Sequence, residues 1–257
     1  MNIISVITVC YNENHRKIQK TFDSILGQSY NSVEFIVVDG GSNEYTLNAI
    51  RFWSSKINKF VSEPDKGIFD AMNKGIKLAT GEWICFMNVG DSFYNNEALS
   101  NLMRVDHHNA DILYGDVYKL DFGLINSPAK PNSYTFYDSG ICHQAILSRK
   151  SVFERIGDFD LSTKLYGDAD WVMRAFISGI SLLYIPEIVC FYEGGGVTSD
   201  NINLEKERQI YLEKYFNSRQ RIFYKVRSIY QRILNRILGL DMRIPYFIKN
   251  CLSRLRF

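Results

Sequence analysis

Four short apolar runs in the first third of the chain each end in a group of polar residues, and this repetition constrains the fold more than any other feature. The runs cover residues 3–10, 33–38, 59–62 and 82–87. They are rich in β-branched residues, and helical patterns at residues 15–27 and 68–79 lie between them. Such alternation predicts an α/β fold with a mostly parallel central sheet and helices on both faces.

Polar residues follow all four predicted strands. They occupy residues 11–14 (YNEN), 39–43 (DGGSN), 63–67 (EPDKG) and 88–91 (NVGD). Parallel strands end at a common edge of their sheet, and open α/β folds bind ligands at that edge. Taken singly, these residues can also be explained as helix caps or turns. Their shared position favours a ligand site.

The rest of the chain has a less regular pattern. Residues 111–118 and 181–192 are predicted strands, and residues 168–178 are a predicted helix. From about residue 203 the pattern is helical, with breaks near Gly239 and at Pro245. No GxGxxG follows the first strand, and no GxxxxGKS or GxxxxGKT occurs, which argues against a dinucleotide-binding fold and a P-loop.

Composition excludes several classes of protein. Hydrophobic residues make up 46% of the 257 residues, enough for a sizeable core, so the chain is not intrinsically disordered. The five cysteines form no CxxC pair, and we expect a reducing compartment rather than a disulfide framework. No apolar run reaches the length of a membrane-spanning helix, and the opening residues lack a basic leader. We therefore expect a cytosolic protein.

Charge divides the chain into two parts. Residues 214–257 contain 11 of the 30 basic residues and one of the 28 acidic residues, so their formal charge is +10 and that of residues 1–213 is −8. We predict one domain over residues 1–213, with halves at about 1–95 and 96–213, and a basic C-terminal extension. An acidic body with a basic tail is information about partners rather than about the fold.

Apolar residues of the extension recur between arginines at steps of three and four, as in a basic amphipathic helix. They are Ile222, Phe223, Val226, Ile229, Tyr230, Ile233, Leu234, Ile237 and Leu238. Such a helix can lie in the headgroup layer of an anionic membrane. Alternatively, it packs its apolar face on the body and leaves the arginines in solvent. Nucleic-acid binding is a third alternative, which the acidic body and the absence of a nucleic-acid motif disfavour.

Five side chains are candidates for chemistry. Asp91 could share a divalent ion with a diphosphate, and Asp39 could accept a hydrogen bond from a nucleobase. Asp168 and Asp170 open a predicted helix, where a carboxylate could act as a general base, and their spacing indicates that only one of them faces a site. His143 is a candidate ligand. A structural role as a cap, turn residue or packed residue stays open for each.

Five segments carry a resemblance to a known family. They are SVITVCYNE, EFIVVDGGSNEYT, SEPDKGIFDAMNKGIKLATGEWICFMNVGDSFY, HQAILSRKSVFERIGDFD and GDADWVMR. Through them, over about residues 3–195, the chain resembles family two of the glycosyltransferases, which are inverting enzymes of the GT-A fold. It is most similar to the bacterial branch that builds O-antigen, capsule and exopolysaccharide.

The resemblance implies a Rossmann-like nucleotide-binding half and assigns residues to it. Tyr11 and Glu13 match positions near the base and the ribose, and Asp39 matches the acid that reads the nucleobase. Gly67 and Asn73 match positions beside the nucleotide. We therefore expect these five residues to contact the nucleotide sugar.

Asp91 matches the last acid of the family's metal motif, which implies Mg²⁺ or Mn²⁺ as a cofactor. Gly90 and Asn88 stand where that motif commonly has acids, and Asn88 is assigned to nucleotide-sugar binding. His143 is a candidate for a further metal or phosphate contact.

Asp168 matches the family's catalytic base, with Gly167 in place of the usual preceding glutamate, and Asp170 is the reserve candidate. The implied reaction is inverting transfer of a hexosyl or N-acetylhexosaminyl group from a nucleotide sugar, a UDP-sugar by preference. The implied acceptor is a polyprenyl-diphosphate-linked glycan at the cytoplasmic face of the membrane, where the enzyme is peripheral. No nucleic-acid partner is expected.

Two alternatives follow from departures from the family pattern. Gly90 and Gly167 would also suit a catalytically silent protein that only binds a sugar nucleotide. Sugar nucleotidylyltransferases share a related fold, but the chain lacks a Gly-rich activating loop after its first strand.

Overall fold

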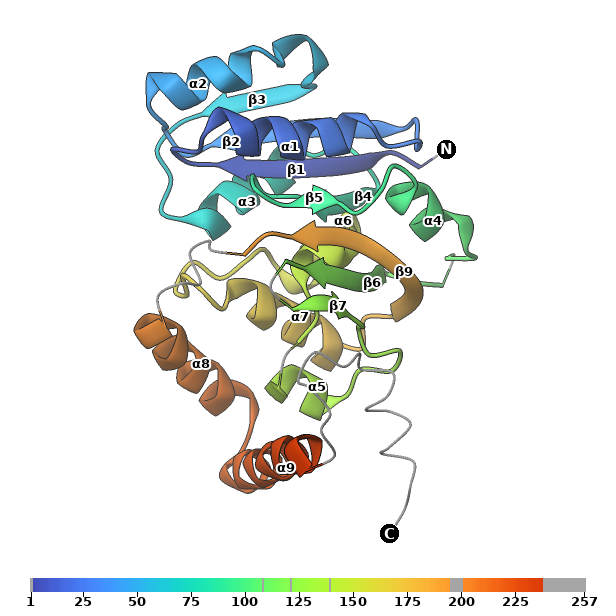
Figure 1. The fold of residues 1–257 in the computed structure, drawn as a ribbon, viewed down its shortest axis with the longest axis vertical. Helices are drawn as coiled ribbons and strands as arrows, with labels where there is room; N and C mark the ends of the chain where they lie inside the picture. The colour runs from blue at the N-terminus through green and yellow to red at the C-terminus, as the bar shows by residue number, and fades with distance from the viewer. Residues whose placement is uncertain (1, 108, 121, 139, 195–200, 238–257) are drawn as a thin grey trace.

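The computed structural model describes residues 2–107, 109–120, 122–138, 140–194 and 201–237. Over these residues, nine strands form one sheet in the order β3-β2-β1-β4-β8-β6-β9-β5, with β7 beside β6 (Figure 1). Side chains of a strand alternate between the two faces of a sheet. In β1, Ile7 and Val9 belong to one hydrophobic core, whereas Ile4 and Val6 belong to the other. The predicted α/β fold, with both faces covered, is confirmed.

The first half of the sheet has the regular βαβ order that the sequence predicts. Its strands are β1 (Ile4–Cys10), β2 (Val33–Asp39), β3 (Lys59–Ser62) and β4 (Trp83–Phe86). Its helices are α1 (His15–Leu26), α2 (Glu44–Arg51) and α3 (Ile68–Leu78), with a 3-10 turn η1 (Ser54–Lys56). β1 pairs in parallel with β2 and β4, and β2 pairs in parallel with β3. All four predicted strands are confirmed, and their carboxyl ends share one edge.

Local sequence explains where two of these helices begin. The side chain of Asn14 accepts a hydrogen bond from the backbone N–H of Lys17 at the start of α1. The side chain of Asn43 accepts one from the N–H of Thr46 at the start of α2. These are the contacts of N-cap residues. The polar groups after β1 and β2 therefore serve partly as caps, while other members of the same groups remain for the site.

The second half of the sheet mixes parallel and antiparallel pairs. Its strands are β5 (Ser92–Phe93), β6 (Ile112–Lys119), β7 (Gly123–Ile125), β8 (Ile146–Arg149) and β9 (Leu182–Tyr192). Its helices are α4 (Ala98–Arg104), α5 (Ser133–Asp138), η2 (His143–Ala145), α6 (Lys150–Ile156) and α7 (Gly167–Ile177). β8 lies antiparallel between β4 and β6, whereas β6 and β9 are parallel. The sequence pattern predicted β6, β9 and α7 but not the short β8. In the middle of the sheet, β8 runs in the opposite direction to its two neighbours, β4 and β6.

Two helices, α8 (Asn201–Tyr215) and α9 (Ser218–Ile237), form the described C-terminal part. The domain boundary predicted after residue 213 falls within the last turn of α8, and Phe216 beyond it is buried in the core of the body. The breaks predicted near Gly239 and Pro245 lie outside the described residues. In the described part of the chain, no helix is both long and apolar enough to cross a membrane.

Candidate active site

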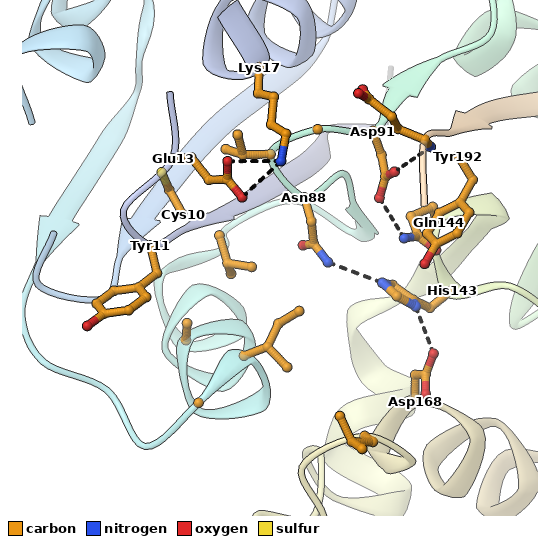
Figure 2. A pocket seen from close by; sticks show the side chains of 18 of the residues that line it. Cys10, Tyr11, Glu13, Lys17, Asn88, Asp91, His143, Gln144, Asp168 and Tyr192 are labelled. Atoms are coloured by element: carbon orange, nitrogen blue, oxygen red, sulfur yellow. Dashed lines mark hydrogen bonds and ion pairs between the residues drawn. The ribbon is translucent and has the colours of Figure 1, made fainter. Parts of the chain in front are cut away.

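A cavity of about 470 Å³ lies where β1 and β4 end and the second half of the sheet begins (Figure 2). One wall comes from the segments after β1 and β4 and from the start of α3. The facing wall comes from η2, the first turn of α7 and the end of β9. Seven of the residues predicted for the site line this cavity. They are Tyr11, Glu13, Gly67, Asn88, Asp91, His143 and Asp168.

His143 connects the two walls of the cavity. Its Nδ1 lies 2.8 Å from Oδ2 of Asp168, and its Nε2 lies 3.3 Å from Nδ2 of Asn88. An ionised carboxylate can only accept hydrogen bonds, so we place a proton on Nδ1. Figure 2 shows the resulting chain of contacts from Asn88 through His143 to Asp168. The imidazole therefore fixes the position of the Asp168 carboxylate relative to the loop after β4.

The contact between His143 and Asp168 changes the acidity of both groups. Burial raises the pKa of Asp168, but the hydrogen bond and the charge of His143 outweigh burial, so this pKa lies below its ordinary value of 3.8. Burial lowers the pKa of His143, but the hydrogen bond and the charge of Asp168 outweigh it, so this pKa lies above its ordinary value of 6.5. Asp168 is consequently ionised at neutral pH, as a general base must be.

Asp91, for which the sequence predicts a divalent ion shared with a diphosphate, lines the cavity, and only 7% of its surface is exposed. Its Oδ2 accepts a hydrogen bond from Nε2 of Gln144 at 2.7 Å, and its Oδ1 accepts one from the backbone N–H of Glu193 at 3.2 Å. Burial raises the pKa of Asp91 above its ordinary value, although these donors act against the shift. Since Gln144 adjoins His143, one dipeptide contacts both Asp91 and Asp168.

Two cavity residues with side-chain oxygens, Asp91 and Asn88, can be compared with the ligands that a divalent cation needs. Within the described residues, no three or more His, Cys, Asp or Glu side chains gather as a metal site. The buried Oδ1 of Asn88, however, has no hydrogen-bond partner in the part of the chain that the structure describes. One carboxylate and one amide oxygen are too few for a protein cage, but Mg²⁺ commonly takes one or two protein ligands and completes its shell with phosphate and water. The donor set fits a cation of that kind.

Two glycines stand where the family commonly has acids, and the structure gives a reason for each. Gly90 has a φ of +106°, a conformation that residues with a Cβ rarely adopt. A Cβ on Gly167 would lie 2.7 Å from the ring of Phe69, so the close approach of α3 and α7 requires glycine there. Neither departure removes Asp91 or Asp168 from the cavity.

Asp39 is fully buried at the end of β2 and does not line the cavity directly. Its Oδ2 accepts hydrogen bonds from the N–H groups of Gly41 and Ser42 and from the hydroxyl of Ser62, at 3.1, 2.9 and 2.7 Å. Its Oδ1 is buried and has no hydrogen-bond partner among the described residues. One oxygen therefore stabilises the turn, as expected if Asp39 is a turn residue, and the other oxygen is unpaired within the described part of the chain.

Asn73 and Asp170 have positions that differ from their assignments to the site. Asn73 faces away from the cavity: its Nδ2 donates to the carbonyl oxygen of Phe159 at 2.9 Å, and its Oδ1 accepts from the N–H of Phe159 at 3.0 Å. Helical periodicity explains this position, because Gly67 at the N-cap of α3 and Asn73 within it lie on different faces. Asn73 thus ties α3 to the segment before α7.

Asp170, the reserve base, is also outside the cavity, as the two-residue spacing from Asp168 predicts. It is 3% exposed and forms ion pairs with Arg174 and Lys214 at 2.9 and 2.7 Å. The hydroxyl of Tyr215 donates to it at 2.6 Å. Asp170 therefore anchors the end of α8 to α7.

Several cavity residues were not assigned to the site from the sequence. They are Lys17, Lys66, Lys164, Gln144, Tyr192 and Glu193. Lys66 belongs to the polar group after β3, and Gln144 directly follows the candidate ligand His143. Nothing in the sequence pattern singles out Lys17 or Lys164, because a lysine in a helix or loop is usually only solvated. Lysines that line a cavity suit a negatively charged ligand, and one of them, Lys17, already forms an ion pair with Glu13 at 3.1 Å.

Comparison with protein families matches residues 5–155, more than half of the chain, to glycosyl transferase family 2. The chain belongs to this family. It is therefore a glycosyltransferase. A PGL/p-HBAD biosynthesis glycosyltransferase of Mycobacterium bovis (strain BCG / Pasteur 1173P2) is 29% identical over 212 residues, which cover 80% of this chain and 78% of that protein. Glycosyltransferase GlyG of Streptococcus pneumoniae serotype 4 is 24% identical over 169 residues, which cover 64% of this chain and 54% of that protein.

Solved structures of other proteins have the same fold. S. aureus TarS 1-349 in complex with UDP-GlcNAc matches with a TM-score of 0.65 at 19% identity, over 99% of this chain and 76% of that chain. The mannosyltransferase PcManGT from Pyrobaculum calidifontis, in complex with GDP-Man and Mn²⁺, matches with a TM-score of 0.61 at 19% identity. That match covers 77% of this chain and 58% of PcManGT. The predicted family and the GT-A fold are confirmed.

Proposed function

We propose that this family 2 enzyme transfers a hexosyl or N-acetylhexosaminyl group from a UDP-sugar to a polyprenyl-diphosphate-linked glycan, with inversion at the anomeric carbon. The product would be a repeat unit of a bacterial surface polysaccharide such as O-antigen, capsule or exopolysaccharide. One observation carries the proposal. An ionised carboxylate, Asp168, faces the same cavity as a buried acid, Asp91, and three lysines.

The acceptor side of the reaction requires a base. In a single displacement, an acceptor hydroxyl oxygen bonds to the anomeric carbon while the bond from that carbon to the diphosphate breaks. Asp168 takes the hydroxyl proton, and attack from the face opposite the leaving group inverts the configuration. The hydrogen bond from His143 holds the Asp168 carboxylate in place for this step.

The leaving-group side requires positive charge, because the diphosphate becomes more negative as its bond to the sugar breaks. Asp91 and Asn88 would hold Mg²⁺ or Mn²⁺, which would neutralise part of this charge when bound. Lys17, Lys66 and Lys164 line the same cavity and would bind phosphate oxygens. PcManGT was solved with Mn²⁺ and GDP-Man together, and this pairing in a protein of the same fold supports the cofactor.

The nucleotide would lie on the wall formed by the first half of the sheet. In this proposal Oδ1 of Asp39, which has no partner among the described residues, accepts the N–H of a uracil ring, and Tyr11 and Glu13, which line the cavity, contact the base and the ribose. TarS was solved with UDP-GlcNAc and PcManGT with GDP-Man, so the fold accommodates more than one nucleotide sugar. Among these we favour UDP, the nucleotide that the resemblance implies by preference.

We place the reaction at the cytoplasmic face of the membrane, where a lipid-linked acceptor would be located. We propose no nucleic-acid partner. The Mycobacterium relative is a glycosyltransferase of PGL/p-HBAD biosynthesis, which supports a glycan pathway in general and leaves this acceptor as our own proposal.

A donor screen tests the proposal. The full chain is incubated with UDP-, GDP- and dTDP-sugars, with and without Mn²⁺, and release of the nucleoside diphosphate is measured. We expect metal-dependent release from one or more UDP-sugars by the wild type, and none above background by Asp168→Asn. Donor binding without turnover by the wild type would contradict the proposal and favour the catalytically silent alternative.

A further inference from the structure

Helix α9 presents a stripe of apolar side chains to solvent. The stripe consists of Ile222, Phe223, Val226, Ile229, Tyr230 and Ile233, whose exposed fractions lie between 48% and 65%. Steps of three and four residues place them on one face of the helix. Exposed apolar side chains that gather on one face of a helix are a mark of an interaction site.

The opposite face of α9 attaches the helix to the body. The ring of Tyr224 packs on Tyr134 and Tyr137 of α5, with ring centroids 5.4 and 5.2 Å apart. Next to these rings, Ser228 donates a hydrogen bond to Asp138 at 3.4 Å. Since α9 is held by this face, the apolar stripe is not what fastens it. The sequence-based alternative, in which the apolar face packs on the body, is wrong for the described part of α9.

Positive charge accompanies the stripe. Helix α9 contains no acidic residue, and the exposed side chains of Arg219 and Lys225 lie within the turns that begin the stripe. The extension over residues 214–257 carries +10, whereas residues 1–213 carry −8. An anionic surface would therefore be attracted to α9 and repelled by the body, which orients the protein with α9 towards that surface.

The same charges decide between the occupants that could cover the stripe. A second copy of α9 would bring its own arginines and lysines against those of the first. Residues 238–257 are also basic, with Arg243, Lys249, Arg254 and Arg256 against Asp241. Both a second copy of α9 and residues 238–257 are therefore positively charged, as α9 itself is. An anionic lipid surface offers apolar chains beneath negative headgroups, and it complements both properties of α9.

We propose that α9 lies in the headgroup layer of an anionic membrane, with its apolar stripe turned towards the acyl chains. This inference deepens the proposed function. It rests on that function in one respect, because the lipid-linked acceptor is the reason that the enzyme would need a membrane. Lys214 and Tyr215, just before α9, bond to Asp170 of α7, the helix that also carries Asp168. Figure 1 shows α9 at the end of the molecule opposite α2 and β3. The membrane would thus lie on the side of residues 96–213, the half of the domain to which we assign acceptor binding.

Vesicle flotation of the full chain tests the surface. Vesicles contain phosphatidylcholine alone or phosphatidylcholine and phosphatidylglycerol in equal parts, and no donor or metal is added. We expect the protein to float only with the anionic vesicles, and less so as salt is raised. The triple variant Ile222→Ser, Phe223→Ser, Val226→Ser should lower the partition coefficient at least about tenfold. Lys225→Gln alone should lower it about fivefold.

A matched control removes apolar side chains elsewhere. Tyr45 and Phe52, at the α2 end of the molecule, are 65% and 75% exposed, so Tyr45→Ser with Phe52→Ser should fold and float like the wild type. Thermal unfolding of each variant confirms that the fold is intact. Binding to both vesicle types alike, no binding by the wild type, or unchanged binding by the triple variant would overturn the inference. So would a dimer that the triple variant abolishes, or salt-sensitive RNA binding without vesicle binding.

The experiments test membrane binding by α9 and the transfer reaction separately. Flotation is measured without turnover, so its failure leaves the proposed transfer reaction standing. If the protein floats with anionic vesicles but releases no nucleoside diphosphate from any donor, the proposal of membrane binding stands and the proposed reaction is contradicted.

Discussion

The two halves of the sheet deliver residues to the cavity in different ways. In the half from β1 to β4, all strands are parallel, and the segments after them reach one edge by topology alone. In the half from β5 to β9, the strand direction is mixed, and the site residues sit on a 3-10 turn and on the first turn of α7. The wall after β1 and β4, which we propose as the nucleotide wall, thus follows from strand order, whereas the wall of η2, α7 and β9, which we propose as the catalytic wall, depends on contacts between distant segments.

Asp168→Asn should have the largest effect, and it should distinguish the contributions of the two walls to turnover and to nucleotide binding. We expect kcat to fall by about 10³-fold, because the amide cannot take the acceptor proton, while binding of UDP stays within about twofold of the wild type. Turnover and calorimetric titration with UDP measure the two effects. Equal losses in turnover and in UDP binding would mean that Asp168 serves the nucleotide wall as well, and the distinction between the walls would not hold.

Asp170→Asn should show how far the catalytic wall depends on packing. The change leaves Arg174 and Lys214 beside an uncharged, buried side chain, and we expect the free energy of unfolding to fall by about 3 kcal/mol. Burial raises the pKa of Asp170, but its bonds to Lys214, Tyr215 and Arg174 outweigh burial, so this pKa lies below its ordinary value of 3.8.

The pH dependence of that loss follows from the lowered pKa. The ionised Asp170 stabilises the fold fully above pH 3.8, and this contribution disappears as pH falls through the lower, folded-state pKa. Denaturation curves at several pH values should therefore show the wild type and the variant converging only in acid. Tyr215→Phe, which removes one hydrogen bond and no charge, serves as the milder control at about 1 kcal/mol. A constant gap at all pH values would refute an ionic role for Asp170.

His143→Gln should test the contact that joins the walls. We expect kcat to fall by about 10- to 100-fold, because Asp168 loses the donor that fixes it, while the Mn²⁺ concentration for half-maximal activity is unchanged. A large rise in that Mn²⁺ concentration would instead assign His143 to the metal. Unaltered turnover and unaltered metal dependence would exclude both roles.

Asp39→Asn should have the smallest effect and touch only the nucleotide wall. The amide oxygen can keep the turn contacts, but the group that replaces Oδ1 becomes a donor and cannot accept a base N–H. We expect the donor KM to rise about tenfold with little change in kcat. Ser62→Ala weakens the turn without touching Oδ1, and steady-state kinetics should show a smaller rise. A larger effect from Ser62→Ala would mean that turn stability, rather than base recognition, governs the site.

Much of the first half of the protein was predictable because its signals are local. Runs of β-branched residues and helical spacing located β1 to β4, and capping side chains such as Asn14 and Asn43 act within three residues of themselves. The short strand β8 was missed, because it forms by antiparallel pairing with β4 and β6, which are distant from it in the sequence. The glycines at 90 and 167 were visible as departures, but their reasons, a left-handed φ and the ring of Phe69, are properties of the folded chain.

By itself, the sequence determined the fold class, the edge at which the site forms and the division of charge between body and tail. Only the tertiary structure decided that His143 contacts Asp168 across 25 positions of the chain, that Asp170 binds the end of α8, and that the apolar stripe of α9 faces outward. The reason is physical. Hydrophobic period and capping depend on neighbours along the chain, whereas the partner of a polar side chain depends on which distant segment the packing of the core places beside it.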